Sequence, residues 1–416
     1  MQTRILPELL STADGQRADA ILRNCVHCGF CLATCPTYQV RGDELDSPRG
    51  RIDLIKTLLE TGEATTATRQ HLDRCLGCRA CETTCPSGVK YHQLLAIGQR
   101  ELERRVPRSL PQRLIREALR RGLTSSLLAP AVRLGEWLRP LMPGPLRDKL
   151  QASRLPPSEA LGGTLARSSS GRSNAHAAVI LPRGCVQPAL DADIDAATVT
   201  VLQALDLEVL QPPAGACCGA IAAHLDDQDR AAAQARANID AWWPLLESGA
   251  ASAIVSNASG CGLTLRDYAD WFVDDPLYAD KARAVAAATV DIAVCLQQYR
   301  SRWPERWTRV APQAVAWHPP CTLQHGLRNA DAVETTLREL GFDPQRPADA
   351  HLCCGSAGTY SLLQPELASE LRSRKLAALD AVAGEVIVTA NIGCQRHLSA
   401  ASARPVLHWV QLLARR

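Results

Sequence analysis

The carboxy-terminal half of the chain alternates short apolar runs with stretches of helical character. Residues 177–181 (AAVIL) and 252–256 (SAIVS) are compact β-rich runs, which predict buried strands. Residues 197–207 (ATVTVLQALDL) lie between such runs and predict a helix. Regular alternation of this kind indicates small α/β units whose strands are parallel.

The amino-terminal part has a different pattern, in which apolar residues recur at helical spacing. Residues 47–62 (SPRGRIDLIKTLLETG) predict one such helix, with Ser47 able to cap its start and Gly62 able to end it. Its apolar positions are Ile52, Leu54, Ile55, Leu58 and Leu59. We therefore expect the amino-terminal domain to be mostly helical.

A third pattern occupies residues 109–123 (SLPQRLIREALRRGL), where leucines and an isoleucine alternate with arginines. This spacing predicts a basic amphipathic helix. Such a helix can pack on its own domain with its arginines in water, dock on a partner subunit, or rest on an anionic membrane surface. It falls within residues 101–175, an arginine-rich stretch with proline and glycine breaks that is expected to be a linker with short helices.

Composition narrows the class of protein. A chain of 416 residues suggests two or three domains, and a net charge of +3 argues against a general nucleic-acid binder. The most apolar stretch, residues 284–296, is too short to cross a bilayer and is interrupted by Thr289 and Asp291. The start of the chain lacks the apolar core of a signal peptide, so we expect a reducing compartment in which 17 cysteines favour metal binding over disulfides.

Two stretches concentrate these thiols. Residues 25–35 (CVHCGFCLATC) and 75–85 (CLGCRACETTC) each precede a proline and share the pattern C-x-x-C-x-x-C-x-x-x-C-P, by which bacterial-type ferredoxins hold 4Fe-4S clusters. The fourth cysteine of each motif is expected to open a helical segment and to point away from the other three. In two-cluster ferredoxins this cysteine binds the other cluster. The expected ligands are Cys25, Cys28, Cys31 and Cys85 for one cluster, and Cys75, Cys78, Cys81 and Cys35 for the second. Zinc and plain buried thiols are the alternatives, but zinc ribbons need only paired CxxC motifs.

Residues near the motifs have expected supporting roles. Pro36 and Pro86 lack an amide hydrogen and fix the direction in which the chain leaves each motif. Gly29 and Gly77 allow backbone amides to approach the cluster sulfides. Two arginines at the start of the predicted helix, Arg49 and Arg51, either raise the potential of a nearby cluster or are simply solvated.

A repeat organises the second half of the chain. Each copy has a cysteine, then a Cys-Cys-Gly sequence 32 positions later, then a further cysteine. The cysteines are Cys185, Cys217, Cys218 and Cys261 in the unit expected over residues 176–300, and Cys321, Cys353, Cys354 and Cys394 in the unit expected over residues 301–416. Each set is large enough for an additional metal site if Gly219 and Gly355 bend the chain.

Other candidate ligands are weaker. Cys295 aligns with the region of His408 and Trp409 in the second copy, which predicts a core residue rather than a ligand. His318 and His351 lie close to the repeat cysteines and can ligate a metal or relay protons, but a structural histidine with satisfied hydrogen bonds is the favoured interpretation.

Two four-cysteine motifs followed by two Cys-Cys-Gly (CCG) repeats resemble the iron-sulfur subunits of glycolate oxidase, the membrane-associated glycolate dehydrogenase of bacteria, within the CCG-repeat iron-sulfur oxidoreductases. The resemblance covers nearly the whole chain, including NCVHCGFCLATCPTY, SPRGRI and RCLGCRACETTCPSGV. It implies an α+β fold: a mostly helical domain with two 4Fe-4S clusters (1–100), a basic helical linker (101–175) and two tandem α/β cysteine-rich units.

The same resemblance implies a function. A partner subunit containing FAD oxidises glycolate to glyoxylate, and this chain passes the electrons to quinone or another membrane acceptor from the cytoplasmic face of the inner membrane. No GxGxxG sequence follows a predicted strand, so neither flavin nor NAD is expected on this chain. The chain is expected to act by electron transfer and to contribute no catalytic side chain.

The repeats depart from one relative. In heterodisulfide reductase the last block of each repeat is CxxC, whereas Ala258 and Asn391 stand at the corresponding positions here. This puts a third cluster of that kind in doubt, and leaves a different metal site or a redox-silent scaffold. Alternative functions are the iron-sulfur subunit of a lactate or glycerol-3-phosphate dehydrogenase complex, a heterodisulfide-reductase-like thiol-disulfide enzyme, and a protein whose clusters are structural or sensory.

Overall fold

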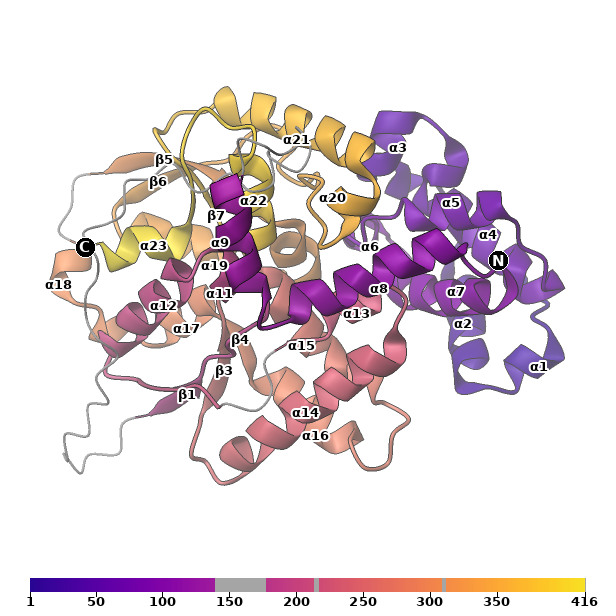
Figure 1. Ribbon diagram of the computed structural model, residues 1–416, viewed down its shortest axis with the longest axis horizontal. Helices are drawn as coiled ribbons and strands as arrows, with labels where there is room; N and C mark the ends of the chain where they lie inside the picture. The colour runs from indigo at the N-terminus through magenta and orange to yellow at the C-terminus, as the bar shows by residue number, and fades with distance from the viewer. Residues whose placement is uncertain (139–176, 213–216, 309–311, 416) are drawn as a thin grey trace.

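The computed structural model describes residues 1–138, 177–212, 217–308 and 312–415 (Figure 1). The proline- and glycine-rich breaks expected between residues 140 and 174 lie outside these ranges. A helical domain, indigo and violet in Figure 1, occupies one end of the molecule. Two α/β units occupy the other end, and two further helices extend from the helical domain over them.

The amino-terminal domain contains no strand in residues 1–105, which confirms the mostly helical prediction. Its helices are α1 (Pro7–Leu10), α2 (Ala13–Asn24), α3 (Pro36–Arg41), α4 (Pro48–Thr61), α5 (Thr66–Asp73), α6 (Ala80–Thr84) and α7 (Tyr91–Arg105). The domain boundary expected at residue 100 falls inside α7.

Helix α4 forms as its sequence predicts. The hydroxyl of Ser47 accepts a hydrogen bond from the Gly50 amide at 2.9 Å, and Gly62 ends the helix with φ of 75°. The apolar face of α4 packs on α7, where a Cβ added to Gly98 would lie 2.7 Å from the Ile55 side chain. This close approach fixes the helix that connects the two cysteine motifs.

The two α/β units repeat one topology. The first sheet has the order β2-β1-β3-β4 and the second has the order β6-β5-β7-β8, with every strand pair parallel. The strands are β1 (Ala178–Ile180), β2 (Glu208–Leu210), β3 (Ala253–Ser256), β4 (Thr289–Asp291), β5 (Gln313–His318), β6 (Phe342–Gln345), β7 (Ile387–Thr389) and β8 (Val406–His408). The predicted tandem α/β units are therefore confirmed.

Helices cover both sheets. Those of the first unit are α11 (Gln187–Leu190), α12 (Asp193–Gln203), α13 (Ala220–His224), α14 (Gln228–Glu247), α15 (Ser259–Trp271), α16 (Ala279–Ala288) and α17 (Ile292–Gln298). Those of the second are α18 (Glu305–Thr308), α19 (Ala330–Glu339), α20 (Tyr360–Leu363), α21 (Pro365–Asp380), α22 (Ile392–Ser399) and α23 (Trp409–Ala414).

The two units share one hydrophobic core. Val179 and Val255 of the first sheet lie in the same buried cluster as Trp317 and Trp409 of the second unit. Helix α12 packs on α23, and the Ser259 amide donates to the Ala390 carbonyl at 3.1 Å. Cys295 is fully buried in this cluster, as expected for a core residue.

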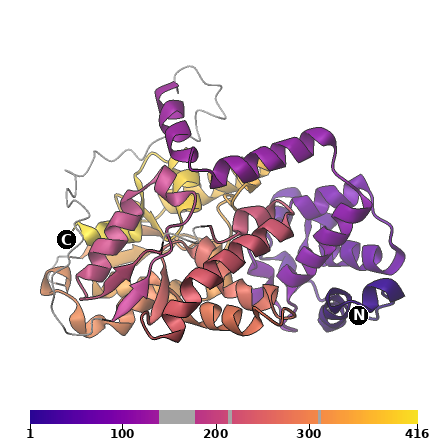
Figure 2. The same cartoon turned by 60° about the horizontal axis from the view of Figure 1, so that its bottom comes forward.

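Helix α8 (Leu110–Thr124) runs along one edge of the molecule, and α9 (Leu128–Leu138) turns away from it and projects outward (Figure 2). The predicted amphipathic helix forms, but the expectation that its arginines face water is wrong for Arg116. This guanidinium is buried and lies 3.0 Å from the Asp226 carboxylate, whereas the side chains of Leu110 and Leu114 are each 70% exposed. Ion pairing with the first unit therefore turns the apolar face of α8 outward.

Candidate metal centres

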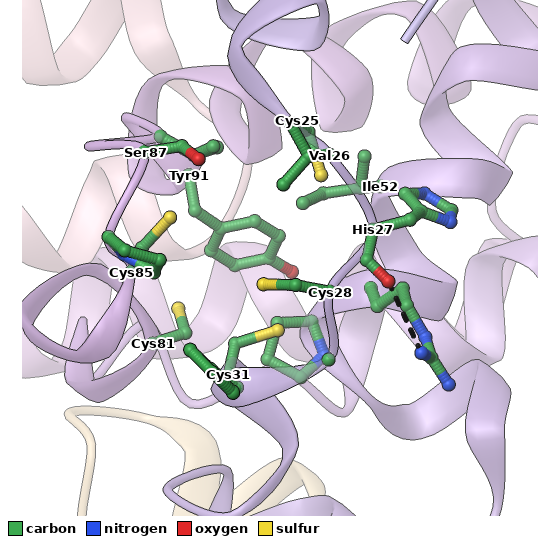
Figure 3. A pocket seen from close by; sticks show the side chains of 16 residues that line it. Cys25, Val26, His27, Cys28, Cys31, Ile52, Cys81, Cys85, Ser87 and Tyr91 are labelled. Carbon is green, nitrogen blue, oxygen red and sulfur yellow. Dashed lines mark hydrogen bonds between the residues drawn. The ribbon is translucent and has the colours of Figure 1, made fainter.

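The first cysteine motif surrounds a hollow in the helical domain. Cys25, Cys28 and Cys31 line it together with Cys81 and Cys85 of the second motif. Figure 3 shows these side chains reaching the same space from separate segments of the chain, around the ring of Tyr91. The hollow thus brings together thiols that are more than fifty residues apart in sequence.

The second motif surrounds a neighbouring hollow. Cys75, Cys78 and Cys81 line it together with Cys35 of the first motif. Of the two fourth cysteines, Cys85 lines the first hollow and Cys35 the second, so each lies with the other motif. This placement agrees with the crosswise arrangement expected from the spacing, while the assignment of individual sulfurs as ligands stays a prediction. Cys81 lines both hollows.

Left-handed backbone shapes both loops around their middle cysteine. Cys28 lies between His27 (φ 55°) and Gly29 (φ 82°). Cys78 lies between Gly77 (φ 62°) and Arg79 (φ 61°). The left-handed conformation of a non-glycine residue costs about 1 kcal/mol of folding free energy. His27 adopts it in the first loop and Arg79 in the second. The Gly77 amide donates to the Cys75 sulfur at 3.4 Å, while the approach of backbone amides to cluster sulfides stays a prediction.

The fourth cysteines differ in their local structure. Cys35 directly precedes α3, with Pro36 as the first helical residue, which matches the expectation that this cysteine opens a helix. Cys85 instead follows the end of α6, and residues 86–87 form a turn. The expectation is therefore wrong for the second motif, because the chain must turn after Pro86 to enter α7.

The spacing of these thiols fits a cluster better than a single ion. Four thiolates around one zinc ion lie about 3.8 Å apart, given a Zn–S distance of about 2.3 Å. Among the described residues, three groups of metal-ligating side chains have all their ligand atoms within 4.8 Å of one another, and none includes a cysteine of the two motifs. The eight thiols surround wider spaces, which suits iron-sulfur clusters rather than zinc.

Both arginines at the start of α4 lie beside the hollows. Arg51 is buried and lines the second hollow, with its guanidinium 4.0 Å from the Cys35 sulfur, so the solvated alternative is wrong for this residue. Arg49 lines the first hollow and pairs with Glu44 at 2.8 Å. Their effect on cluster potentials stays a prediction.

Two features of the helical domain were missed in the sequence. Tyr91 lines both hollows, and its hydroxyl donates to the Cys75 sulfur at 3.7 Å. Burial raises the pKa of Tyr91, so the hydroxyl keeps its proton. The fully buried carboxylate of Asp46 accepts from Arg51 at 3.4 Å and from Arg74 at 3.0 Å, and lies 3.0 Å from His71. No spacing rule connects these residues with the cysteines.

The repeat cysteines form a chain of neighbours in each unit. In the second unit, the sulfur of Cys321 lies 3.8 Å from that of Cys353, and Cys354 lies within hydrogen-bonding reach of Cys353 and Cys394. Cys185, Cys217, Cys218 and Cys261 are arranged in the same way in the first unit.

The expected bends occur at the two glycines that follow the cysteine pairs. Gly219 has φ of 89° and Gly355 has φ of 91°. A Cβ at Gly219 would lie 2.9 Å from the Ala231 carbonyl oxygen of α14, and a Cβ at Gly355 would lie 2.6 Å from the Ala368 carbonyl oxygen of α21. Glycine is therefore required by the turn and by the close packing of α14 and α21.

The second hollow adjoins the second α/β unit. Cys78 and Cys321 pack against one apolar cluster that contains Leu76 and Cys353. The Tyr360 hydroxyl donates to the Arg74 carbonyl at 3.1 Å. The predicted cluster domain and a CCG unit therefore meet at their cysteines.

A cavity of about 650 Å³ lies between the units and the helical domain. Its walls include cysteines of both units and apolar residues of α8 and α9, among them Leu123, Leu128 and Val132. A volume of this size is typical of small-molecule sites. Its position where the carboxyl ends of both sheets converge is one at which α/β proteins commonly bind ligands.

No helix in the described ranges is both long enough and apolar enough to cross a membrane.

Two protein families match this chain. Residues 21–89 match the family described as 4Fe-4S dicluster domain. Residues 180–266 and 315–399 each match the family described as cysteine-rich domain (CCG). The matches confirm an iron-sulfur domain followed by two cysteine-rich units.

Two curated proteins are similar to this chain over 90% or more of its length, and a third is similar to about half of it. The glycolate oxidase iron-sulfur subunit of Escherichia coli (strain K12) is 46% identical over 414 residues, which cover 99% of this chain and 98% of that protein. A probable glycolate oxidase iron-sulfur subunit of Bacillus subtilis (strain 168) is 31% identical, covering 90% and 87%. Lactate utilization protein A of Bacillus licheniformis is 25% identical over 55% of this chain and 95% of its own length.

Proposed function

Because the chain belongs to the family of glycolate oxidase iron-sulfur subunits, we propose that it is the electron-transfer subunit of a flavin-dependent glycolate dehydrogenase complex. A partner subunit that contains FAD oxidises glycolate to glyoxylate, and this chain delivers the electrons toward quinone. The observation that carries the proposal is the pair of adjacent cysteine-lined hollows, in a chain that is similar to such a subunit over 99% of its length.

The eight motif cysteines are the proposed ligands of two 4Fe-4S clusters. Cys25, Cys28, Cys31 and Cys85 hold one, and Cys75, Cys78, Cys81 and Cys35 hold the other. Each such cluster takes up and releases one electron at a time. Two clusters can therefore carry away, one by one, the two electrons that a reduced flavin holds. The chain keeps the two sites close, because Cys81 and Tyr91 line both hollows, and it supplies Arg51 as a buried positive charge beside the second.

One observation favours a second substrate. Proteins named lactate utilization protein A are similar to about half of this chain. The alternative is therefore an iron-sulfur subunit for the oxidation of lactate, another 2-hydroxyacid. The longer match to glycolate oxidase subunits favours glycolate.

Electron delivery gives a direct test. We expect glycolate to reduce the clusters of the anaerobic complex, seen by electron paramagnetic resonance, only when the flavoprotein partner is present. In the Cys78→Ser variant, quinone reduction should fall to background because a proposed cluster ligand is lost, while dye-linked glycolate oxidation by the partner persists at least in part.

The matched control is Cys295→Ala, which removes a core thiol that lies in neither hollow and should leave quinone reduction near its original rate. An undiminished quinone rate in Cys78→Ser would contradict the electron-transfer role. Reduction by lactate but not by glycolate would support the alternative substrate.

We further propose that the outward face of α8 and α9 lies on the cytoplasmic surface of the inner membrane. Its exposed apolar side chains are Leu110, Leu114 and Ile115 of α8, Leu127 of the turn between the helices, and Leu134 and Trp137 of α9. Exposed Arg113, Arg121 and Arg133 lie on the same two helices. Apolar residues combined with arginines are typical of helices that bind anionic lipid surfaces.

Membrane binding can be measured by vesicle flotation. Replacing Leu114 and Trp137 together by glutamate should weaken binding to phosphatidylglycerol vesicles at least ~100-fold, because each buried apolar side chain contributes about 1.5–3 kcal/mol. Leu277→Glu is the control, since Leu277 is 75% exposed but lies outside α8 and α9. Equal binding by the double variant and the control would exclude this face as the membrane contact.

A further inference from the structure

Three ligand-type side chains meet in the core of the second α/β unit. His318 ends β5, Cys354 immediately precedes the bend at Gly355, and Cys394 lies in the first turn of α22. One ligand atom from each lies within 4.8 Å of the other two. All three residues are buried, with exposed fractions of 0%, 1% and 4%, respectively.

The imidazole of His318 has no hydrogen-bond partner among the described residues. Both ring nitrogens are buried and unpartnered, so the interpretation of His318 as a satisfied structural histidine is wrong. The last position of β5 turns the ring into the interior beside the two thiols, where water does not reach it. A buried polar group without a partner is unfavourable, and an ion bound there would use one of its nitrogens.

The spacing of this group suits one ion rather than a cluster. Zinc binds thiolate at about 2.3 Å and imidazole at about 2.0 Å, so its ligand atoms lie about 3.5–3.8 Å apart. The three atoms of this group lie within 4.8 Å of one another, so small side-chain shifts would let one ion bind all three. The thiols around the two hollows of the helical domain form no such group, which separates this site from the proposed cluster sites.

A buried lysine lies beside the group. Lys375 of α21 has an exposed fraction of only 4%, and its ammonium donates to the Asp349 carbonyl at 2.7 Å. It interacts electrostatically with the thiols of Cys354 and Cys353. Two thiolates balance the charge of a divalent ion, so the filled site would be neutral and would not repel this ammonium.

The first unit lacks this arrangement. Pro182 stands three positions before Cys185, where His318 stands before Cys321. In the described part of the chain, the thiols of the first unit also form no group of three within the same distance. The other two groups contain carboxylates already paired with arginines: Asp46 with Arg51 and Arg74, and Asp267 with Arg79.

We propose that His318, Cys354 and Cys394 bind a single divalent transition-metal ion, for which zinc is the best match. Two thiolates and one imidazole form a donor set that favours zinc or iron over magnesium or calcium. Binding converts the two thiols to thiolates and releases their two protons. Cys394 also lines the large cavity, so the ion would lie beside its wall. This site goes beyond the proposed function and does not depend on it.

Metal counting on the full-length chain, purified without air, tests the site. We expect about one zinc ion per chain in addition to the iron of the clusters, or about one iron in excess of acid-labile sulfide. His318→Leu and Cys394→Ser should each lose that ion and keep their cluster iron. Cys261→Ser, the first-unit counterpart of Cys394→Ser, should retain it.

Cobalt uptake gives a second readout. The wild-type chain, after chelator treatment that spares the clusters, should bind about one Co²⁺ with thiolate-to-cobalt absorption, and His318→Leu should bind it at least ~10-fold more weakly. A wild-type chain that holds no additional ion and takes up neither Co²⁺ nor Zn²⁺ would overturn the proposal. So would about four additional irons with equal sulfide, because that count indicates a third cluster. Neither measurement involves glycolate or the flavoprotein.

Discussion

Combining Cys85→Ser with Cys28→Ser is expected to remove no more iron than Cys85→Ser alone, whereas combining it with Cys78→Ser is expected to remove nearly all of it. The reason is geometric: Cys85 and Cys28 line the first hollow, and Cys78 lines the second. The first pair should therefore retain about four irons per chain and the second pair about none.

Iron and acid-labile sulfide, measured on anaerobically purified variants, decide between the two arrangements. If each motif held its own cluster, Cys85 and Cys78 would share one, and their double variant would retain about four irons instead. That outcome would contradict the crosswise assignment. Cys35→Ser provides the mirror control. Adding Cys78→Ser to it should remove no further iron, whereas adding Cys28→Ser should remove both clusters.

Replacing the buried Asp46 by asparagine should destabilise the helical domain by about 3–5 kcal/mol. The carboxylate is fully buried and accepts from Arg51 at 3.4 Å and from Arg74 at 3.0 Å. Its loss leaves the Arg51 guanidinium, which is also buried, without its carboxylate. Removing one member of a buried ion pair is far more harmful than removing a surface charge.

Urea unfolding of the anaerobic holoprotein, followed by circular dichroism and cluster absorbance, measures this effect. Asp53→Asn is a suitable control because it removes an exposed carboxylate from the same helix as Arg51, with an expected change below about 0.5 kcal/mol. If the two variants unfolded at the same urea concentration, Asp46 would not be the stabilising centre of this network.

Local patterns predicted the elements that depend on local interactions. Helix α4 could be placed with its caps because Ser47 and Gly62 act within one turn of its ends. The repeat of the cysteines along the chain predicted two units with one topology, and both sheets have the same strand order. The motif spacing also predicted a crosswise ligand assignment, which agrees with the lining of the two hollows but stays a prediction.

Properties that depend on distant residues could not be predicted in this way. The sequence pattern of α8 defines an apolar face and a basic face but does not show which of them packs on the protein. Asp226 of the first unit determines this by pairing with Arg116. The environment of His318 depends on the Gly355 bend, which follows α19 and β6, and on α22, which follows α20, α21 and β7 as well. The contact region of Cys78 with the second unit joins segments more than 240 positions apart in sequence.

Because the two α/β units share one hydrophobic core, neither unit is expected to be stable on its own. Trp317 and Trp409 are fully buried in a cluster that also contains Val179 and Val255 of the other half. A half expressed alone would present these surfaces to water and would be prone to aggregate. The two copies therefore form an obligate internal dimer, and a cut between them would leave fragments held together by the same apolar contacts.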